Sequence, residues 1–299
     1  MNDYHTSVLL HETIEWVNVQ AEKRYIDATL GGGGHTAEIL SRGGKVLGID
    51  QDQDALEFAE KDLRLRIKDL RIGQDLFLVK GNFKDIDRIG RDNGFKNLSG
   101  VIFDLGVSSH QFDQADRGFS FQKEGPLDMR MDTDLKVKAA DLIHILTKGE
   151  LYELFTKLGE ERFARSIITS IIRARQVKKI ETTTELADII NRAVPYRQKG
   201  VSPATRVFQA LRIAVNDELN NLIEALPKAR DLLGDKGRVV VITFHSLEDR
   251  IVKHQFRDWA EQGFGNVLTK KPITPSEEEI ENNKRSRSAK LRVFERKFK

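Results

Sequence analysis

The sequence contains no cysteine, so disulfides, thiolate zinc sites and cysteine nucleophiles are excluded. It also lacks any apolar run near the about 20 residues that a membrane-spanning helix needs. The segment Met1–His5 has no basic stretch followed by an apolar one, which predicts that no secretory signal is present. We therefore expect a cytoplasmic protein, and nothing in the composition indicates a metal.

Charge is distributed unevenly along the 299 residues, which are 39% hydrophobic and 32% charged, as in a soluble globular protein. Residues 160–215 hold 11 Lys/Arg against 5 Asp/Glu, and residues 284–299 hold 8 against 1. Because the net charge is +3, the rest of the chain carries −10. Two basic segments in an acidic chain indicate a polyanionic partner, although solvated helix faces and a loose tail would give the same pattern.

Short apolar strands alternate with helices in the first third of the chain, and the same pattern returns near the end. This alternation predicts an α/β fold whose parallel sheet is covered on both faces. The final segment, 291–298, alternates apolar and polar residues and is expected to be a last strand that closes the sheet. The expected strands are 24–30, 45–50, 76–79, 100–104 and 238–244, with helices at 36–41, 54–66 and 219–233.

The middle of the chain lacks convincing strands. Residues 106–135 form a long aperiodic stretch, which is typical of a functional or disordered loop. Helices are predicted at 160–175, from the capping box Thr182–Glu185 through Ala193, and after Ser202-Pro203. We expect a core of residues 1–136 and 216–299 interrupted by an all-helical domain of residues 137–215, which would recognise a polyanion such as RNA.

Four consecutive glycines, Gly31 to Gly34, lie between the first strand and its helix, where the backbone can approach a ligand closely. Gly32, Gly34 and Ala37 match the dinucleotide fingerprint, and Asp50 follows at the distance expected for a ribose ligand. A flexible turn is the alternative. The fingerprint alone does not separate NAD from S-adenosylmethionine, since both place an adenosine over the same strand ends.

Residues after the third and fourth strands favour S-adenosylmethionine. Asn82 and Phe83 supply an amide and an aromatic face for an adenine, and Asp104 places an acid toward the methyl-transfer position. A carboxylate after a strand also commonly stabilises a turn, which is the alternative for Asp104. No His or Tyr-Lys pair for hydride transfer is evident. An NAD-dependent oxidoreductase remains an alternative function.

A set of motifs distributed along essentially the whole chain carries a resemblance to a known family. The chain resembles the bacterial 16S ribosomal RNA cytosine-N(4) methyltransferase family (RsmH or MraW). The motifs are His5-Thr6-Ser7-Val8-Leu9-Leu10-His11-Glu12, Gly31-Gly32-Gly33-Gly34-His35, Asp104-Leu105-Gly106-Val107-Ser108-Ser109, Arg117-Gly118-Phe119-Ser120-Phe121, Gly125-Pro126-Leu127-Asp128-Met129-Arg130-Met131-Asp132, Gly159-Glu160-Glu161-Arg162-Phe163-Ala164, Pro203-Ala204-Thr205-Arg206 and Phe244-His245-Ser246-Leu247-Glu248-Asp249-Arg250.

The resemblance implies a Rossmann-like methyltransferase sheet with a helical insertion, and S-adenosylmethionine as the cofactor. The implied substrate is the exocyclic amino group of a decoding-centre (P-site) cytosine of 16S rRNA in the small ribosomal subunit. Gly32 stands where the family often has Arg. A non-catalytic ribosome assembly factor is the alternative to an enzyme. The sequence leaves the oligomeric state, a homodimer included, and the identity of the general base open. The implied cofactor-binding residues are Gly33, Gly34, His35, Asp50, Phe83, Asp104 and Gln111.

Asp104 is the expected catalytic residue, because a cytosine amino group must lose a proton as it attacks the methyl carbon. Asp104-Leu105-Gly106-Val107 lacks the two prolines and the aromatic residue that many amino-methyltransferases have here. Phe119, Phe121 and His245 are therefore candidates for stacking on the base. Packing is the alternative for both phenylalanines.

For His245 the alternative is a turn in which Ser246 caps a helix together with Asp249. The target base must leave its stack to reach the active site, and the enzyme must hold the RNA while it does so. The RNA phosphates therefore need a binding surface. The expected phosphate ligands are Arg162, Arg165, Arg206, Arg212 and the tail Lys284–Lys299.

Overall fold

The computed structural model describes residues 7–194 and 202–298, and the chain divides into two compact units. The first unit comprises Met1–Ser108 and Leu219–Lys299, and the second comprises Ser109–Glu218. The sequence pattern had placed the first boundary after residue 136 rather than after Ser108. His5 and Thr6, which begin the first motif, lie outside the described residues.

A seven-stranded sheet forms the centre of the first unit, with strand order β3-β2-β1-β4-β5-β7-β6. Strands β1 to β5 run parallel, whereas β7 is antiparallel to both β5 and β6. The predicted α/β fold is therefore confirmed. The strands are β1 (Arg24–Asp27), β2 (Lys45–Asp50), β3 (Leu76–Lys80), β4 (Leu98–Asp104), β5 (Leu233–Thr243), β6 (Gly265–Val267) and β7 (Lys290–Arg296).

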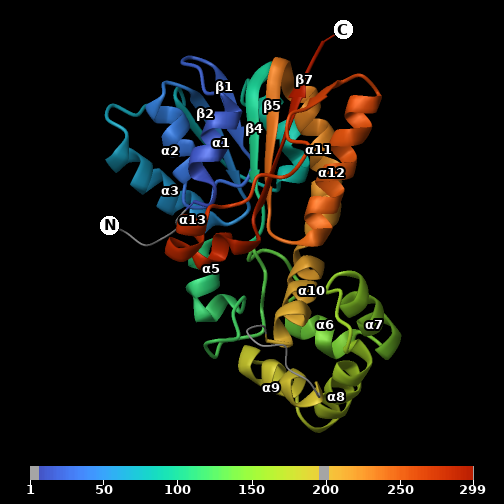
Figure 1. The fold of residues 1–299 in the computed structure, drawn as a ribbon. Helices are drawn as coiled ribbons and strands as arrows, with labels where there is room; N and C mark the ends of the chain where they lie inside the picture. Colours follow the sequence, from blue (N-terminus) through green and yellow to red (C-terminus); the bar gives the residue numbers. More distant parts are fainter. Residues whose placement is uncertain (1–6, 195–201, 299) are drawn as a thin grey trace. The chain divides into compact units, whose positions relative to one another are not determined.

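Helices cover both faces of this sheet (Figure 1). Neighbouring residues such as Tyr25 and Ile26 belong to opposite apolar layers, because successive strand side chains point to opposite faces. Helices α1, α2 and α3 pack on the face of Tyr25, and α4, α11 and α12 pack on the face of Ile26. The helical segments are α1 (Leu10–Val17), α2 (Gly34–Ser41), α3 (Gln53–Arg66), η1 (Phe83–Asp85), α4 (Ile86–Asp92), α11 (Glu218–Leu232), α12 (Ser246–Glu261), α13 (Glu277–Asn282) and η3 (Lys284–Ser288).

The second unit is helical, and no strand occurs among its described residues. The capping box at Thr182 is confirmed, since Thr182 Oγ1 accepts from Glu185 N at 3.3 Å and Glu185 Oε2 accepts from Thr182 N at 3.2 Å. α8 begins at Ala164 rather than Glu160, because Glu160 has a left-handed φ of 48° that no helix interior allows. The segments are α5 (Ser109–Asp113), η2 (Ala115–Arg117), α6 (Ala139–Ile145), α7 (Lys148–Lys157), α8 (Ala164–Val177), α9 (Thr183–Ala193) and α10 (Ala204–Asn216).

The long loop before α6 is ordered by hydrogen bonds within the helical unit. Asn216, at the end of α10, accepts from Met131 N at 2.7 Å and donates to Met129 O at 2.8 Å. Leu127 N donates to Glu181 O at 2.8 Å. A Cβ at Gly125 would lie 1.7 Å from Ala115 O, so only glycine fits this approach. These contacts place the domain boundary before the loop rather than after it.

In the described part of the chain, no helix is both long enough and apolar enough to cross a membrane.

Three cations of the basic tail, which was expected to bind phosphate, have partners within the first unit. Arg292 is buried, and its Nε lies 2.6 Å from Asp249 Oδ1, while Lys290 Nζ lies 3.2 Å from Asp249 Oδ2. Arg296 donates to three carbonyl oxygens, among them Leu233 O at 2.8 Å. These three cations belong to β7, a strand inside the sheet, so the expectation of a phosphate-binding tail is wrong for them.

We expect Asp249→Ala to lower the free energy of unfolding by about 3 kcal/mol, because it leaves the buried Arg292 guanidinium without its partner. Burial alone would raise the pKa of Asp249, but Arg292 and then Lys290 hold it below its usual value. The stabilisation is therefore present above the unfolded-state pKa and is lost as the pH falls through the lower folded-state pKa. Urea unfolding at several pH values measures both effects.

Glu153→Ala is the matched control, because the ion pair of Glu153 with Lys157 is exposed on both sides. It should change the unfolding free energy by less than about 0.5 kcal/mol. Equal effects of the two substitutions would show that the Asp249–Arg292 pair does not anchor β7.

Candidate functional site

Three aspartates lie at the carboxyl ends of adjacent parallel strands. Asp27 ends β1, Asp50 ends β2 and Asp104 ends β4. Asp27 is in register with Gly48 of β2 and with Ile102 of β4, so Asp50 and Asp104 each lie two residues further along. This edge of an open parallel sheet, between strands on either side of the first strand, is where such folds bind ligands.

The glycine turn between β1 and α2 is tied to the end of β2. Asp50 Oδ2 accepts from Gly31 N at 2.8 Å, and Asp50 Oδ1 accepts from Asp52 N at 2.9 Å. Gly31 and Gly33 have φ values of 50° and 75°, which favour glycine. The predicted glycine turn and the predicted acid are therefore brought together, with the backbone of Gly33 and Gly34 leading into α2.

Asp27 and two threonines connect β1, α2 and β4. Thr36 Oγ1, in the first turn of α2, donates to Asp27 Oδ2 at 2.8 Å. Thr29 N donates to Asp27 Oδ1 at 3.4 Å, and Thr29 Oγ1 accepts from Asp104 N at 2.7 Å. These bonds fix the ends of the strands relative to one another.

One carboxylate oxygen of Asp104 accepts no hydrogen bond from the described residues. Its side chain is 11% exposed, and Oδ1 has no hydrogen-bond partner among the described residues. Nδ1 of the buried His35 lies 3.9 Å from Asp104 Oδ2. Among the described residues, Oδ1 therefore makes no hydrogen bond that would cap or stabilise the turn after β4, which argues against the turn-stabilising alternative for this residue. A buried carboxylate oxygen in this state calls for a donor or a cation.

All three carboxyls have raised pKa values. Burial raises the pKa of Asp27 to about 6, against hydrogen bonds from Thr36 and Thr29 that lower it. Burial likewise raises the pKa of Asp50 to about 6, with a smaller contribution from the charges of Asp52 and Asp27. The pKa of Asp104 lies well above its usual value because of burial first, then the charges of Asp27 and Glu248. Burial thus disfavours the charged form of each carboxyl, and a cationic ligand at the strand ends would stabilise that form.

Asn82 and Phe83 have local partners after β3. Asn82 Oδ1 accepts from Lys84 N at 2.9 Å and so caps η1, while Asn82 Nδ2 donates to Gln51 Oε1 at 3.3 Å. The Phe83 ring meets the Phe103 ring edge-on, with centroids 5.7 Å apart. Phe83 is half-buried beside β4, whereas the Asn82 carbonyl is already used in the cap.

Apart from Arg212, six of the predicted residues belong to the helical unit and are described with it. Gln111, on α5, is buried, and so is Phe119 at 5% exposure. The Phe121 ring packs edge-on against Phe208 at 4.9 Å, so the contacts of Phe119 and Phe121 favour the packing alternative. The remaining three are Arg162 and Arg165, both exposed, and Arg206, which is half-buried on α10.

His245 caps α12, but with a different partner from the one predicted. His245 Nδ1 accepts from Glu248 N at 3.4 Å, and Glu248 Oε2 accepts from Phe244 N at 2.8 Å and from His245 N at 3.3 Å. The predicted cap by Ser246 with Asp249 is wrong, because Asp249 is occupied by Arg292. The imidazole therefore closes the strand-to-helix turn.

Sequence reasoning missed Asp27, Thr29 and Thr36. The signal was present for Asp27, since an acid at the end of a strand had identified Asp50 and Asp104. The expected first strand was drawn to residue 30, which placed Asp27 inside it, whereas β1 ends at Asp27. The threonines carry no local signal, because their partners are set by the packing of α2 and β4 on β1.

The fold defines a class: a Rossmann-like α/β protein, in which ligands bind outside the carboxyl ends of the parallel strands. The model of the MraW methylase family matches residues 2–297. The chain belongs to the MraW methylase family.

Relatives are similar over nearly the whole chain. Ribosomal RNA small subunit methyltransferase H of Carboxydothermus hydrogenoformans is 48% identical and covers 98% of this chain and 97% of its own length. The protein of the same name from Sulfurihydrogenibium azorense is 47% identical, covering 98% and 99%. A solved rRNA methylase from Streptococcus thermophilus covers 98% of both chains at 13% identity and a TM-score of 0.47, a likeness too distant to assign a substrate.

Family membership decides between the alternatives that the glycine fingerprint left open. The chain is a methyltransferase, and its cofactor is therefore the methyl donor S-adenosylmethionine and not NAD. The site fits this donor, since a sulfonium cation suits a buried acidic cluster whose Asp104 Oδ1 has no hydrogen-bond partner among the described residues.

These carboxyls predict a pH-dependent preference for S-adenosylmethionine over its neutral product, S-adenosylhomocysteine. A carboxyl with a raised pKa is neutral below it and charged above it, so the sulfonium gains attraction as the pH rises through about 6. We expect the ratio of the two Kd values to change about tenfold between pH 5 and pH 8. Isothermal titration calorimetry with both ligands measures it.

Asp27→Asn removes the charge of one of the two groups whose pKa is about 6 while keeping the side-chain shape, and it should reduce this pH dependence. In the unliganded protein the same ionisation should lower stability as the pH rises through about 6, because the folded state holds its protons more tightly than the unfolded state. A wild-type ratio that is the same at both pH values would contradict the role of the acidic cluster.

Proposed function

We propose that this methyltransferase transfers a methyl group to the N4 amino group of a decoding-centre (P-site) cytosine of 16S rRNA, in the small ribosomal subunit and hence in the cytoplasm. The observation that carries the proposal is the buried Asp104 carboxyl, whose Oδ1 lacks a hydrogen-bond partner among the described residues at the end of β4. The names of the relatives, which specify small-subunit ribosomal RNA, support the substrate class.

The donor would be held by residues at the ends of the first strands. When bound, S-adenosylmethionine supplies an electrophilic methyl carbon on a sulfonium. Asp50, already fixed by two backbone N–H groups, has acceptor capacity left for ribose hydroxyls. Phe83 offers a half-buried ring face for the adenine. The remaining proposed donor-binding residues are Gly33, Gly34, His35, Asp104 and Gln111.

Asp104 would act on the amino group. The lone pair of that nitrogen is delocalised into the cytosine ring, so it needs alignment and an acceptor for its proton. Burial and the charges of Asp27 and Glu248 raise the pKa of Asp104, and a raised pKa makes its carboxylate a better proton acceptor. A nearby backbone carbonyl could share the second hydrogen bond. No cysteine is present for the covalent adduct through which enzymes methylate cytosine at ring carbon 5, in keeping with attack by the exocyclic nitrogen.

The helical unit offers the cations for RNA phosphates. Arg162, Arg173 and Arg206 have no ion pair with any described residue. Arg212, by contrast, is paired with Glu218 at 2.8 Å and 2.9 Å, and Arg175 donates to Ile143 O and Leu146 O. RNA would therefore be bound through the arginines that lack a carboxylate, while the target base leaves its stack.

We expect Asp104→Asn to reduce methyl transfer by at least about a hundredfold, because an uncharged amide does not take the amino proton. Small subunits from cells that lack this protein are incubated with labelled donor, and mass spectrometry of rRNA digests identifies the methylated nucleoside. N4-methylcytidine should form with the wild type and should be almost absent with the variant. Label on any other atom, or full turnover by the variant, would refute the proposal.

Reversing Arg162 and Arg173 to Glu should weaken binding to small subunits, because both exposed guanidinium groups lack carboxylate partners in the described chain. The slope of log Kd against log salt concentration should fall by about 2, one for each lost phosphate contact. S-adenosylmethionine affinity, measured by calorimetry, should not change.

The control is the double variant Lys68→Glu/Lys96→Glu in the first unit, where both lysines are exposed and unpaired within the described residues. It makes the same change in net charge. If this control weakens subunit binding equally, overall charge rather than the helical unit attracts RNA. If reversing Arg162 and Arg173 lowers the affinity for S-adenosylmethionine, these two residues maintain the fold.

A further inference from the structure

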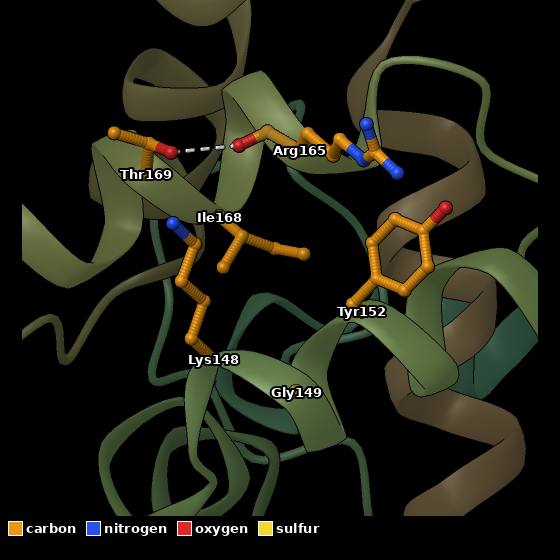
Figure 2. Close-up of a pocket in the computed structure, with 6 residues that line it drawn as sticks. All are labelled: Lys148, Gly149, Tyr152, Arg165, Ile168 and Thr169. Atoms are coloured by element: carbon orange, nitrogen blue, oxygen red, sulfur yellow. Dashed lines mark hydrogen bonds between the residues drawn. The ribbon is translucent and has the colours of Figure 1, made fainter.

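A pocket of about 420 Å³ opens in the helical unit between α7 and α8. Figure 2 shows its lining, with Lys148, Gly149 and Tyr152 on α7 and Arg165, Ile168 and Thr169 on α8. None of the residues proposed to bind the methyl donor lines it. Its volume falls within the range of about 300–1,000 Å³ that is typical of small-ligand sites.

The walls of the pocket combine an aromatic ring, an aliphatic side chain and two cations. Lys148 and Tyr152 lie on opposite sides of Ile168 in Figure 2, with the Arg165 guanidinium on the side of Tyr152. The Arg165 Cζ lies 5.6 Å from the centre of the Tyr152 ring, within cation–π range. Thr169 Oγ1 donates to Arg165 O at 2.8 Å, so this hydroxyl is held by its own helix.

The pocket is positive because no acid neutralises its cations. Neither Lys148 nor Arg165 has an ion pair among the residues that the structure describes. The nearest acid in sequence, Glu150, serves the cap of α7, since its Oε2 accepts from Thr147 N at 2.7 Å. An anionic group entering the pocket would therefore meet two cations without a competing carboxylate from that helix turn.

We propose that this pocket binds one unpaired nucleotide of the substrate RNA. The base lies against Tyr152 and Ile168, and its phosphates lie at Lys148 and Arg165. An aromatic side chain can stack on an RNA base only when that base is not paired and stacked in a duplex. The occupant is therefore single-stranded. An acidic protein segment would use the two cations but would supply no planar base to lie against the Tyr152 ring.

This inference rests on the proposed function for the identity of the RNA as ribosomal. It goes beyond that function because it assigns a second nucleotide site, apart from the target base, to the helical unit. Such a site would favour RNA whose nucleotides near the target are unpaired, and would contribute affinity that is tolerant of sequence, since every base has a face that can stack.

Two pairs of variants test the pocket. Tyr152→Ala removes the ring, and Tyr152→Phe retains it. Gly149→Leu fills the pocket without touching its charges, and Gly149→Ala is the control. A Cβ at Gly149 meets no atom within 4 Å, and its helical position favours any residue over glycine, so both Gly149 variants should fold.

The first readout is the Kd of a fluorescent single-stranded RNA of mixed sequence, compared with the same strand annealed to its complement. Tyr152→Ala and Gly149→Leu should raise the single-strand Kd about tenfold, equal to about 1.4 kcal/mol, and leave the duplex Kd unchanged. Tyr152→Phe and Gly149→Ala should stay within about twofold of the wild type. Calorimetry should give the same Kd for S-adenosylmethionine in all five proteins.

The second readout is methyl transfer to small subunits, which separates this inference from the function on which it rests. KM for subunits should rise about tenfold for Tyr152→Ala and Gly149→Leu, with little change in kcat. If the wild type methylates subunits but neither variant weakens single-stranded RNA binding, the pocket proposal is overturned alone. If the variants weaken only binding to assembled subunits, the pocket contacts protein, which overturns it as well.

If the wild type transfers no methyl group to subunit rRNA, the proposed function fails, and the single-strand Kd values still decide whether the pocket binds a nucleotide.

Discussion

The burial of three carboxyls at the ends of β1, β2 and β4 is the constraint on which the rest of the site depends. Burying a carboxylate is unfavourable unless hydrogen bonds or an opposite charge compensate it. Asp27 and Asp50 are compensated by threonine and backbone donors, whereas Asp104 has an oxygen with no hydrogen-bond partner among the described residues. The strand ends are therefore arranged for a cation, and a sulfonium donor supplies one. The same hydrogen bonds hold the glycine turn and α2 against the ends of β1 and β2.

The positive charge of the chain is divided between two different uses. In β7, Arg292 and Lys290 meet Asp249, and Arg296 meets backbone carbonyls, so this basic segment holds the sheet together. In the helical unit, Arg162 and Arg165 have no carboxylate partner among the described residues. Counting charges along the sequence treats the two segments alike. Their contacts separate a structural segment from one that is available to a polyanion.

The long loop of residues 114–138 shows how an aperiodic segment becomes ordered. Arg117 donates to Arg130 O and Met131 O, and Asn216 satisfies both Met129 O and Met131 N. Side chains thus replace the regular backbone ladder that the segment lacks. Since these partners lie in the helical unit, the loop belongs to that unit rather than to the core that its position in the sequence had suggested.

Features set by near neighbours were readable from the sequence alone. β2 spans Lys45–Asp50 as predicted, and the cap of α9 forms at Thr182, because strand alternation and capping depend on residues a few positions apart. The glycine turn and the acids that end β2 and β4 were found for the same reason. The motifs along the whole chain identified the family. Only the tertiary structure decided that Asp27 joins the site, that Glu248 rather than Asp249 caps α12, and which arginines are neutralised. Arg292 and Asp249 are 43 positions apart, and their contact exists only because β7 pairs with β5 beside α12, a consequence of packing that no local pattern records.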